Sequence, residues 1–177
     1  VSHFDTSQVE DMSNMFALCG QLTNLDVSHF DTGKVEDMTA MFHGCSGISS
    51  LDVTHFKTNQ VSSMDKMFSG CSNLKSLDVS FFNTENVESF NSMFANCEKL
   101  TSLDLTRFDT KNLTSMANMF DGCSSITELD FTGFDLSKVV SVEDLFTNCA
   151  KLRSIKMPAQ VTQDINLPNE RIIHDYD

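Results

Sequence analysis

The chain contains 177 residues, of which 12 are Lys or Arg and 25 are Asp or Glu, and its formal net charge at pH 7 is −13. Because phosphate groups and anionic membrane surfaces attract clustered cationic side chains, this composition argues against a nucleic-acid partner and suits cationic partners instead. No apolar run approaches the roughly 20 residues that span a bilayer, and no signal peptide or lipid-anchor motif is visible, so we expect no direct insertion into a membrane.

The sequence repeats with a period of 26 residues from residue 1 to about residue 157. A fixed period of this length is typical of repeat proteins, in which each unit stacks on its neighbours because it is too small to bury its own apolar face. Residues 1–12 already follow the pattern, so we interpret the chain as a piece of a longer protein. The period is clearest in one phenylalanine column: Phe16, Phe42, Phe68, Phe94, Phe120 and Phe146.

Each repeat starts, in chain order, with a short predicted strand. The alternation of apolar and polar residues from Leu25 to Ser28 places Leu25 and Val27 on the buried side. Asp31 and Thr32 then favour a turn and a helix N-cap. The apolar residues that follow are spaced as on one face of a helix. These residues are Val35, Met38, Met41, Phe42 and Cys45.

The sequence therefore predicts an α/β repeat solenoid. We expect a right-handed β-α superhelix, with a parallel sheet on one face and short helices on the other. It would span residues 1–157 in about six units, of which the first is truncated. Leu136 replaces the Thr of the other repeats, so we expect its turn to differ.

Both ends of the predicted solenoid need cover for their apolar residues. At the N-terminal end, we expect Val9, Met12 and Phe16 to lie at an uncovered edge, which leaves end-to-end self-association open. Residues 158–177 contain both prolines and break the pattern, which predicts a C-terminal cap or the start of a linker. The apolar residues available for such a cap are Val161, Ile165, Leu167, Ile172 and Ile173.

The repeat resembles two known patterns. L-x-x-L-x-L-x-x-F over residues 22–30 resembles leucine-rich repeats, although Phe30 stands where Asn or Cys is usual, so the turn must rely on Asp31 and Thr32. LDVSxFDTxxVxxMxxMFxGCSxL more closely resembles the 26-residue repeat of bacterial surface proteins, found in BspA-like proteins and mycoplasma lipoproteins. This resemblance covers residues 1–157 and implies a cell-surface or secreted protein. It also implies adhesion to proteins of a host or a neighbouring cell.

One cysteine recurs in each repeat. A disulfide framework usually has varied spacings, and a zinc site uses pairs such as C-x-x-C, so the constant spacing favours neither. Because unpaired Cys is among the most buried residue types, we interpret the column as a structural ladder of free thiols. Disulfides between neighbouring turns and a metal site remain alternatives. The ladder consists of Cys19, Cys45, Cys71, Cys97, Cys123 and Cys149.

Three columns of residues are predicted to lie on the exposed face of the strands. The acidic column could be solvated, hydrogen-bonded to the neighbouring hydroxyls, bound to a cationic partner or, as a further alternative, bound to calcium. The third column changes size and charge between repeats, as expected where a repeat scaffold carries partner specificity. The histidines in it could also bind a metal, but the repeat alone explains their alignment. The predicted partner-binding residues are Asp26, Asp52, Asp78, Asp104 and Asp130; Ser28, Thr54, Ser80 and Thr106; and His29, His55, Phe81 and Arg107.

No catalytic motif is found in the sequence. It lacks a glycine-rich phosphate loop, G-x-S-x-G and H-E-x-x-H, so we expect no enzyme activity, no cofactor and no metal. The leading hypothesis is a protein–protein interaction or adhesion module that binds through the exposed strand face. The alternatives are a structural spacer and a binder of carbohydrate or divalent cations.

Overall fold

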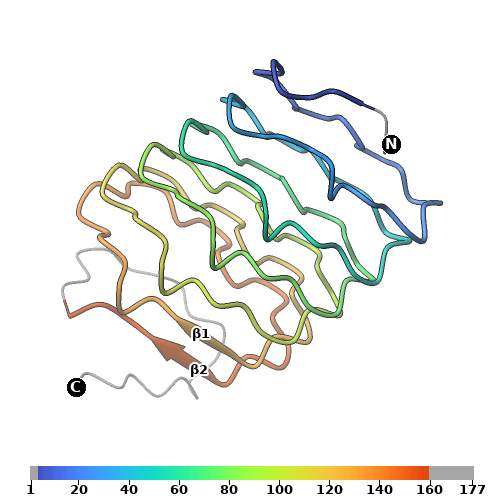
Figure 1. Ribbon diagram of the computed structural model, residues 1–177. Helices are drawn as coiled ribbons and strands as arrows, with labels where there is room; N and C mark the ends of the chain where they lie inside the picture. Colours follow the sequence, from blue (N-terminus) through green and yellow to red (C-terminus); the bar gives the residue numbers. More distant parts are fainter. Residues whose placement is uncertain (1–3, 160–177) are drawn as a thin grey trace.

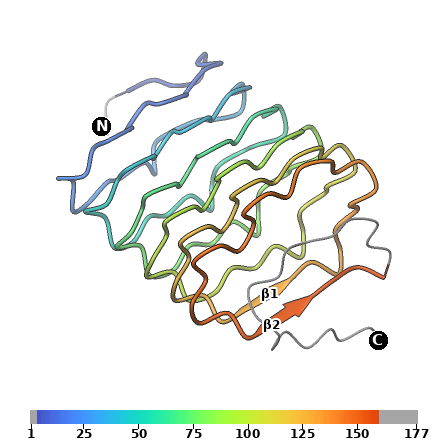
Figure 2. The ribbon, with the colours of Figure 1, turned by 180° about the vertical axis from the view of Figure 1, so that it is seen from behind.

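The computed structural model describes residues 4–159, whose backbone forms coils stacked side by side (Figure 1). The coils follow one another in sequence order from one end of the molecule to the other, and the view from behind shows the same arrangement (Figure 2). The prediction of an α/β solenoid is wrong, because residues 4–159 contain no helix and only two short strands. None of these residues therefore forms a helix that could cross a membrane.

The two strands lie in the last two described repeats. Strand β1 spans Glu128–Asp130 and strand β2 spans Ser154–Lys156, and they form a parallel two-stranded sheet in which Leu129 is paired with Ile155. Both segments occupy the position predicted for the strands. Among the described residues of the earlier repeats, however, no backbone hydrogen bond joins residues 51–53 to residues 77–79, so the predicted continuous sheet is not formed.

The segment predicted as a helix instead forms hydrogen bonds to the next repeat. The Met12, Asn14 and Phe16 N–H groups donate to carbonyls one repeat later in the chain, and the Phe16 bond to Met41 is 2.9 Å long. The residues between them close local turns, as in the 3.3 Å bond from the Met15 N–H to the Met12 carbonyl. An α-helix needs bonds from each N–H to the carbonyl four residues earlier, so this alternation excludes one.

Two residues per repeat have a positive φ, which also excludes a helix. Asn14 has φ 57° and Leu18 has φ 60°. This left-handed backbone conformation costs most residues about 1–2 kcal/mol, whereas Gly and Asn adopt it more readily. The position of Leu18 is accordingly occupied in later repeats by Gly44, Gly70, Asn96, Gly122 and Asn148.

The core is a spine of phenylalanines between the two sides of each coil. The rings of Phe16 and Phe42 are stacked with centroids 5.7 Å apart and planes 3° apart. The same stacking continues through Phe68, Phe94, Phe120 and Phe146. Columns of buried Val, Met, Leu and Ile surround this spine, so each repeat buries its apolar side chains against its neighbours.

A buried threonine joins each repeat to the next. The Thr58 Oγ1 donates to the Asn83 carbonyl at 2.9 Å and accepts the Asn83 N–H at 2.7 Å. Thr32 and Thr6 make the same pair of bonds one and two repeats earlier, respectively. Leu136 keeps the backbone turn, because the Val139 N–H still donates to its carbonyl at 3.1 Å, but it has no hydroxyl with which to bond a following repeat.

The predictions for the two ends have different outcomes. At the N-terminal end, Met12 and Phe16 are buried rather than uncovered, and Val9 is partly buried. The exposed apolar side chains of this repeat include Phe4 and Met15. Most of the predicted cap, with all its apolar candidates from Val161 onward, lies outside the described residues.

Candidate interaction surface

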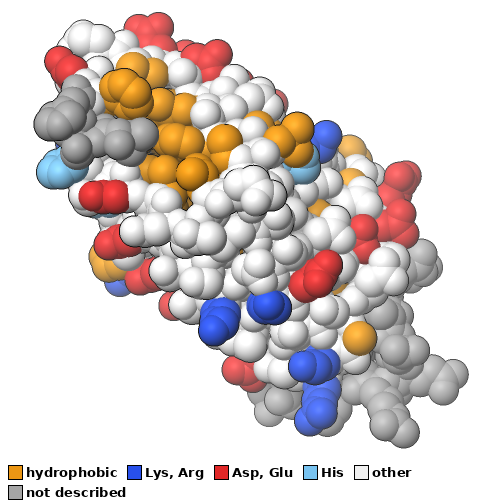
Figure 3. All heavy atoms as spheres, turned by 90° about the vertical axis from the view of Figure 1, so that its right-hand side faces the viewer, with side chains coloured by type: hydrophobic (Ala, Val, Ile, Leu, Met, Phe, Trp, Pro, Cys, Tyr) orange, Lys and Arg blue, Asp and Glu red, His pale blue; other side chains and the backbone are white. Residues whose placement is uncertain are grey.

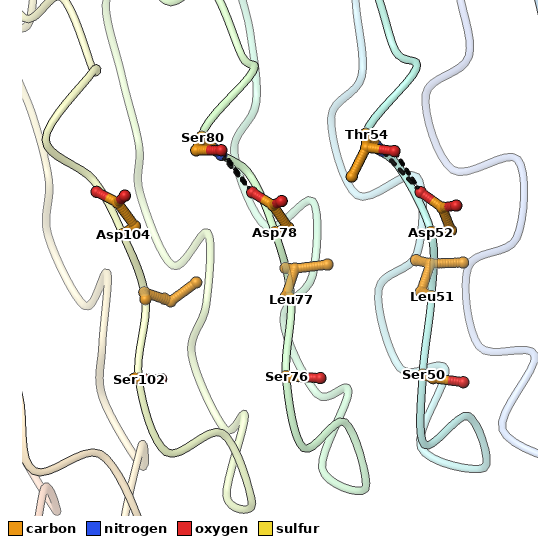
Figure 4. Close-up of a pocket in the computed structure, with 11 residues that line it drawn as sticks. Ser50, Leu51, Asp52, Thr54, Ser76, Leu77, Asp78, Ser80, Ser102 and Asp104 are labelled. Carbon is orange, nitrogen blue, oxygen red and sulfur yellow. Dashed lines mark hydrogen bonds between the residues drawn. The ribbon is translucent and has the colours of Figure 1, made fainter.

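The predicted acidic column lies on the Leu-Asp-Val side of the coils, and a local turn holds each of its side chains. The Asp52 Oδ1 accepts the Thr54 N–H at 3.0 Å and the Thr54 hydroxyl at 2.7 Å (Figure 4). Such bonds to a residue two positions later are the usual behaviour of Asp at a turn. The same pair of bonds joins Asp78 to Ser80, Asp104 to Thr106 and Asp130 to Thr132.

At four of these positions, the hydrogen bonds favour the ionised form of the carboxyl group. Hydroxyl and N–H donors stabilise the charged form, so the side-chain bond from Thr54 and the backbone bond beside it lower the pKa of Asp52 below 3.8. The pKa values of Asp26, Asp104 and Asp130 are lowered by the same two causes. The turn bonds of Asp52, Asp78 and Asp104 engage Oδ1 alone, which leaves Oδ2 of these three carboxylates open to a partner.

An open groove of about 720 Å³ crosses three successive repeats on this side. Its walls are formed by separate coils, because the Leu-Asp-Val segments here are not joined by backbone hydrogen bonds among the described residues. Each repeat contributes a Ser-Leu-Asp set, and Figure 4 shows the three sets lying side by side. The lining contains three carboxylates and no Lys or Arg, so it favours a cationic ligand. The lining residues are Ser50, Leu51, Asp52, Thr54, Ser76, Leu77, Asp78, Ser80, Ser102, Leu103 and Asp104.

A smaller groove of about 290 Å³ continues along this side toward the C-terminal end. It is lined by residues of three repeats, including Asp104, Asp130 and Lys156. The Lys156 Nζ lies 3.6 Å from the Asp130 Oδ2, and both side chains are substantially exposed. The acidic column is therefore partly neutralised where β1 and β2 pair, whereas the lining of the larger groove contains no Lys or Arg.

The variable column lies at the end of the same segments. His29, His55, Phe81 and Arg107 are all exposed, and Phe81 is 60% exposed. The His55 Nε2 forms a 2.9 Å hydrogen bond with the Val27 carbonyl, and its ring packs edge-on against Phe56. The structure thus places these side chains beside the acidic and hydroxyl columns, to which the predicted Asp26 and Ser28 also belong.

The cysteines line the core and not this surface. All six are free, and each except Cys19 is buried. The Cys45 Sγ donates to the Phe16 carbonyl at 3.1 Å, and the later cysteines repeat this bond to the preceding repeat. Burial raises the pKa of Cys45 and Cys149 to about 11 and that of Cys71 to about 12, so these thiols remain protonated at neutral pH.

No group of three or more His, Cys, Asp or Glu residues within residues 4–159 is arranged to hold a metal ion. His29 and His55 therefore do not belong to such a group among the described residues. The signal that sequence reasoning missed was the repeated Ser of the Ser-Leu-Asp sets: Ser50, Ser76 and Ser102.

The chain was compared with known proteins. A family model described as "Mycoplasma protein of unknown function, DUF285" matches residues 1–77 and residues 45–157. The two matches overlap and together cover the whole repeat region. A search of curated proteins returned no match.

Proposed function

The chain belongs to the DUF285 family of Mycoplasma proteins of unknown function, and we propose that it is a non-enzymatic module that binds a protein partner through the larger groove. The observation that supports this proposal is the row of carboxyl groups at Asp52, Asp78 and Asp104 in a groove whose lining contains no Lys or Arg. A partner with a basic, extended surface segment is complementary to it.

The resemblance to BspA-like repeats supports a location at the cell surface and a role in adhesion. A shallow, open groove suits a protein partner better than a small molecule, which is usually enclosed on most sides. The exposed column of His55, Phe81 and Arg107 borders the groove and differs between repeats. In this proposal the carboxylates provide attraction, and the variable side chains provide selectivity between partners.

A binding assay with a short oligolysine peptide tests the charge of the groove. The triple variant Asp52→Asn, Asp78→Asn and Asp104→Asn should weaken binding by about tenfold, since an exposed ion pair contributes about 0.2–1 kcal/mol. The triple lysine variant at the same positions should abolish it. Raising the salt concentration should weaken binding to the unmodified chain.

A matched control removes the same number of charges elsewhere. Asp5, Asp11 and Asp135 each accept the N–H of a serine two residues later but do not line the groove. The variant with Asn at these three positions should bind oligolysine nearly as tightly as the unmodified chain. Equal losses in the two triple variants would show that net charge alone attracts the peptide, and would contradict a groove site.

A structural spacer is the second candidate function. The series of hydrogen bonds from Thr6 onward joins each described repeat to the next, which favours a rigid unit that could project other domains. If the chain is only a spacer, cells that display the groove variants should adhere as well as cells that display the unmodified chain. Loss of adhesion in the Asp52, Asp78 and Asp104 variants, with the control triple unaffected, would exclude this candidate.

A further inference from the structure

The larger groove contains backbone N–H groups that are buried and unpaired. Val53 and Val79 are 0% and 1% exposed, yet neither N–H donates a hydrogen bond to another described residue. The carbonyls that face them in the pattern, those of Asp78 and Asp104, accept none from the described residues either. A buried N–H group without a partner is rare in folded proteins, because nothing replaces its lost hydration. The groove segments therefore have an unused capacity to bond to one another.

The equivalent backbone groups are paired between β1 and β2. The Phe131 N–H, which corresponds to that of Val53 three repeats earlier, donates to the Lys156 carbonyl at 2.8 Å. Leu129 is paired with Ile155 in the same parallel register, and Figure 1 shows the two strands side by side. The backbone positions that remain unpaired in the groove thus form hydrogen bonds elsewhere in the same molecule.

The pairing begins beside the groove but does not continue into it. The Lys75 N–H donates to the Ser49 carbonyl at 3.3 Å. This bond corresponds to the 2.9 Å bond from the Arg153 N–H to the Thr127 carbonyl, directly before the paired strands. Because the first bond fixes the register, the segments that follow Ser49 and Lys75 are already aligned for further pairing.

Side-chain charge distinguishes the paired segments from the open ones. Asp130 faces Lys156, and the Lys156 Nζ lies 3.6 Å from the Asp130 Oδ2. In the groove, the same column places Asp52, Asp78 and Asp104 on successive coils (Figure 4). Opposite charges stabilise facing positions of paired strands, whereas like charges destabilise them. On the face shown in Figure 3, Lys and Arg side chains gather in the lower half of the molecule, toward the end where Figure 1 places β1 and β2.

The turn hydrogen bonds of the aspartates do not explain this difference. Asp130 accepts the Thr132 N–H at 3.0 Å and the Thr132 hydroxyl at 2.6 Å, as Asp52 does from Thr54. Asp130 is nevertheless paired with Lys156. The charge of the facing side chain is therefore the difference that accounts for pairing at one place and not at the other.

We propose that repulsion among Asp52, Asp78 and Asp104 holds the groove open, and that a basic partner closes it by neutralising these carboxylates. On closure, the Val53 and Val79 N–H groups donate to the carbonyls of the next repeat. This inference rests on the proposed function, since the basic partner is the ligand proposed there. It adds that binding changes the backbone of the groove and draws its walls together around the bound segment.

The variant Asp78→Lys tests the role of charge without any ligand. It places a cation opposite both Asp52 and Asp104, as Lys156 lies opposite Asp130. The Val53 N–H should then donate to the carbonyl at position 78, which a scalar coupling across the hydrogen bond detects by NMR. Hydrogen exchange of this N–H should also be slower by about tenfold or more than in the unmodified chain.

Two further variants separate charge from the turn hydrogen bonds. Asp78→Glu removes the short side chain that bonds Ser80 but keeps the negative charge, so the groove should stay open. Lys156→Glu places like charges opposite each other in the paired strands. Exchange of the Phe131 N–H should therefore become faster by about tenfold, whereas Lys156→Arg should preserve its protection.

Oligolysine added to the unmodified chain tests the coupling between binding and closure. Saturation with this peptide should produce the coupling from the Val53 nitrogen to the Asp78 carbonyl carbon. Three results would overturn the inference: no such coupling in Asp78→Lys, closure in Asp78→Glu, or saturating oligolysine that leaves the Val53 N–H unpaired. A peptide that does not bind at all contradicts the proposed function and closure by a partner together, while the Asp78→Lys result still decides whether charge holds the groove open.

Discussion

The Phe68 ring lies between the rings of Phe42 and Phe94, with centroid separations of 5.7 Å and 5.8 Å. Phe68 itself is fully buried. Each repeat thus contributes one ring to this stack, and no repeat is an independent unit. Replacement of a central phenylalanine therefore weakens the packing of the repeats on both sides.

Replacing Phe68 with alanine should therefore destabilise the protein by about 3–5 kcal/mol, the usual cost of removing a buried phenylalanine. Urea denaturation measures the change. Phe81 is the matched control, because it is 60% exposed, and Phe81→Ala should cost less than about 0.5 kcal/mol. Similar losses in both variants would contradict a stacked aromatic core.

The threonine bridge predicts a second stability effect. Thr58→Val preserves shape but leaves the Asn83 N–H and carbonyl without their partner, so it should lower the free energy of unfolding by about 1–3 kcal/mol. Thr101 is exposed and makes no side-chain hydrogen bond among the described residues. Thr101→Val should therefore be nearly neutral, and a Thr58→Val variant as stable as this control would argue against the bridge.

The reactivity of the thiols tests the environment of the cysteines. In the native protein at pH 8, a thiol-specific reagent such as dithionitrobenzoate should react quickly with Cys19 alone, which is partly exposed. Cys45 and Cys71 are buried, and their pKa values of about 11 and about 12 keep them protonated. Fast reaction of several thiols without denaturant would contradict this arrangement.

The acidic column should make stability depend on pH in the acid range. The folded-state pKa values of Asp52 and Asp104 lie below their ordinary value of 3.8, so the unfolded state binds more protons there. The stabilisation is present above about pH 4 and is lost as the pH falls through the folded pKa values. Urea midpoints of the double variant Asp52→Asn and Asp104→Asn should depend less on pH below this value than those of the unmodified chain. An unchanged pH dependence would argue against the turn hydrogen bonds.

The left-handed residues distinguish the stacked coils from the helices expected from the sequence. Leu18 has φ 60° and is 76% exposed, so Leu18→Gly should stabilise the protein by about 1 kcal/mol through relief of backbone strain. In a helix the same change would destabilise it by about 1 kcal/mol. A urea midpoint that falls in Leu18→Gly would therefore favour a helix in this segment.

The sequence was sufficient to identify the 26-residue period and the columns of Asp, Ser and Thr side chains. It did not reveal the backbone conformation, because apolar residues three or four positions apart occur both in helices and in this series of turns. The recurrence of Gly or Asn directly before Cys45, Cys97 and Cys149 was the available signal for a left-handed residue. The groove could not be predicted from the sequence. It depends on the lack of backbone hydrogen bonds, among the described residues, between the segments that contain Leu51 and Leu77.

The hydrogen bond between the Phe68 N–H and the Met93 carbonyl is the most direct test of stacking through the backbone. Its length is 2.9 Å, and it joins two successive repeats. Scalar coupling across the hydrogen bond, measured by NMR on isotope-labelled protein, should connect the Phe68 nitrogen to the Met93 carbonyl carbon. A coupling from the Phe68 nitrogen to the Met64 carbonyl carbon instead would indicate a helix and contradict the stacked coils.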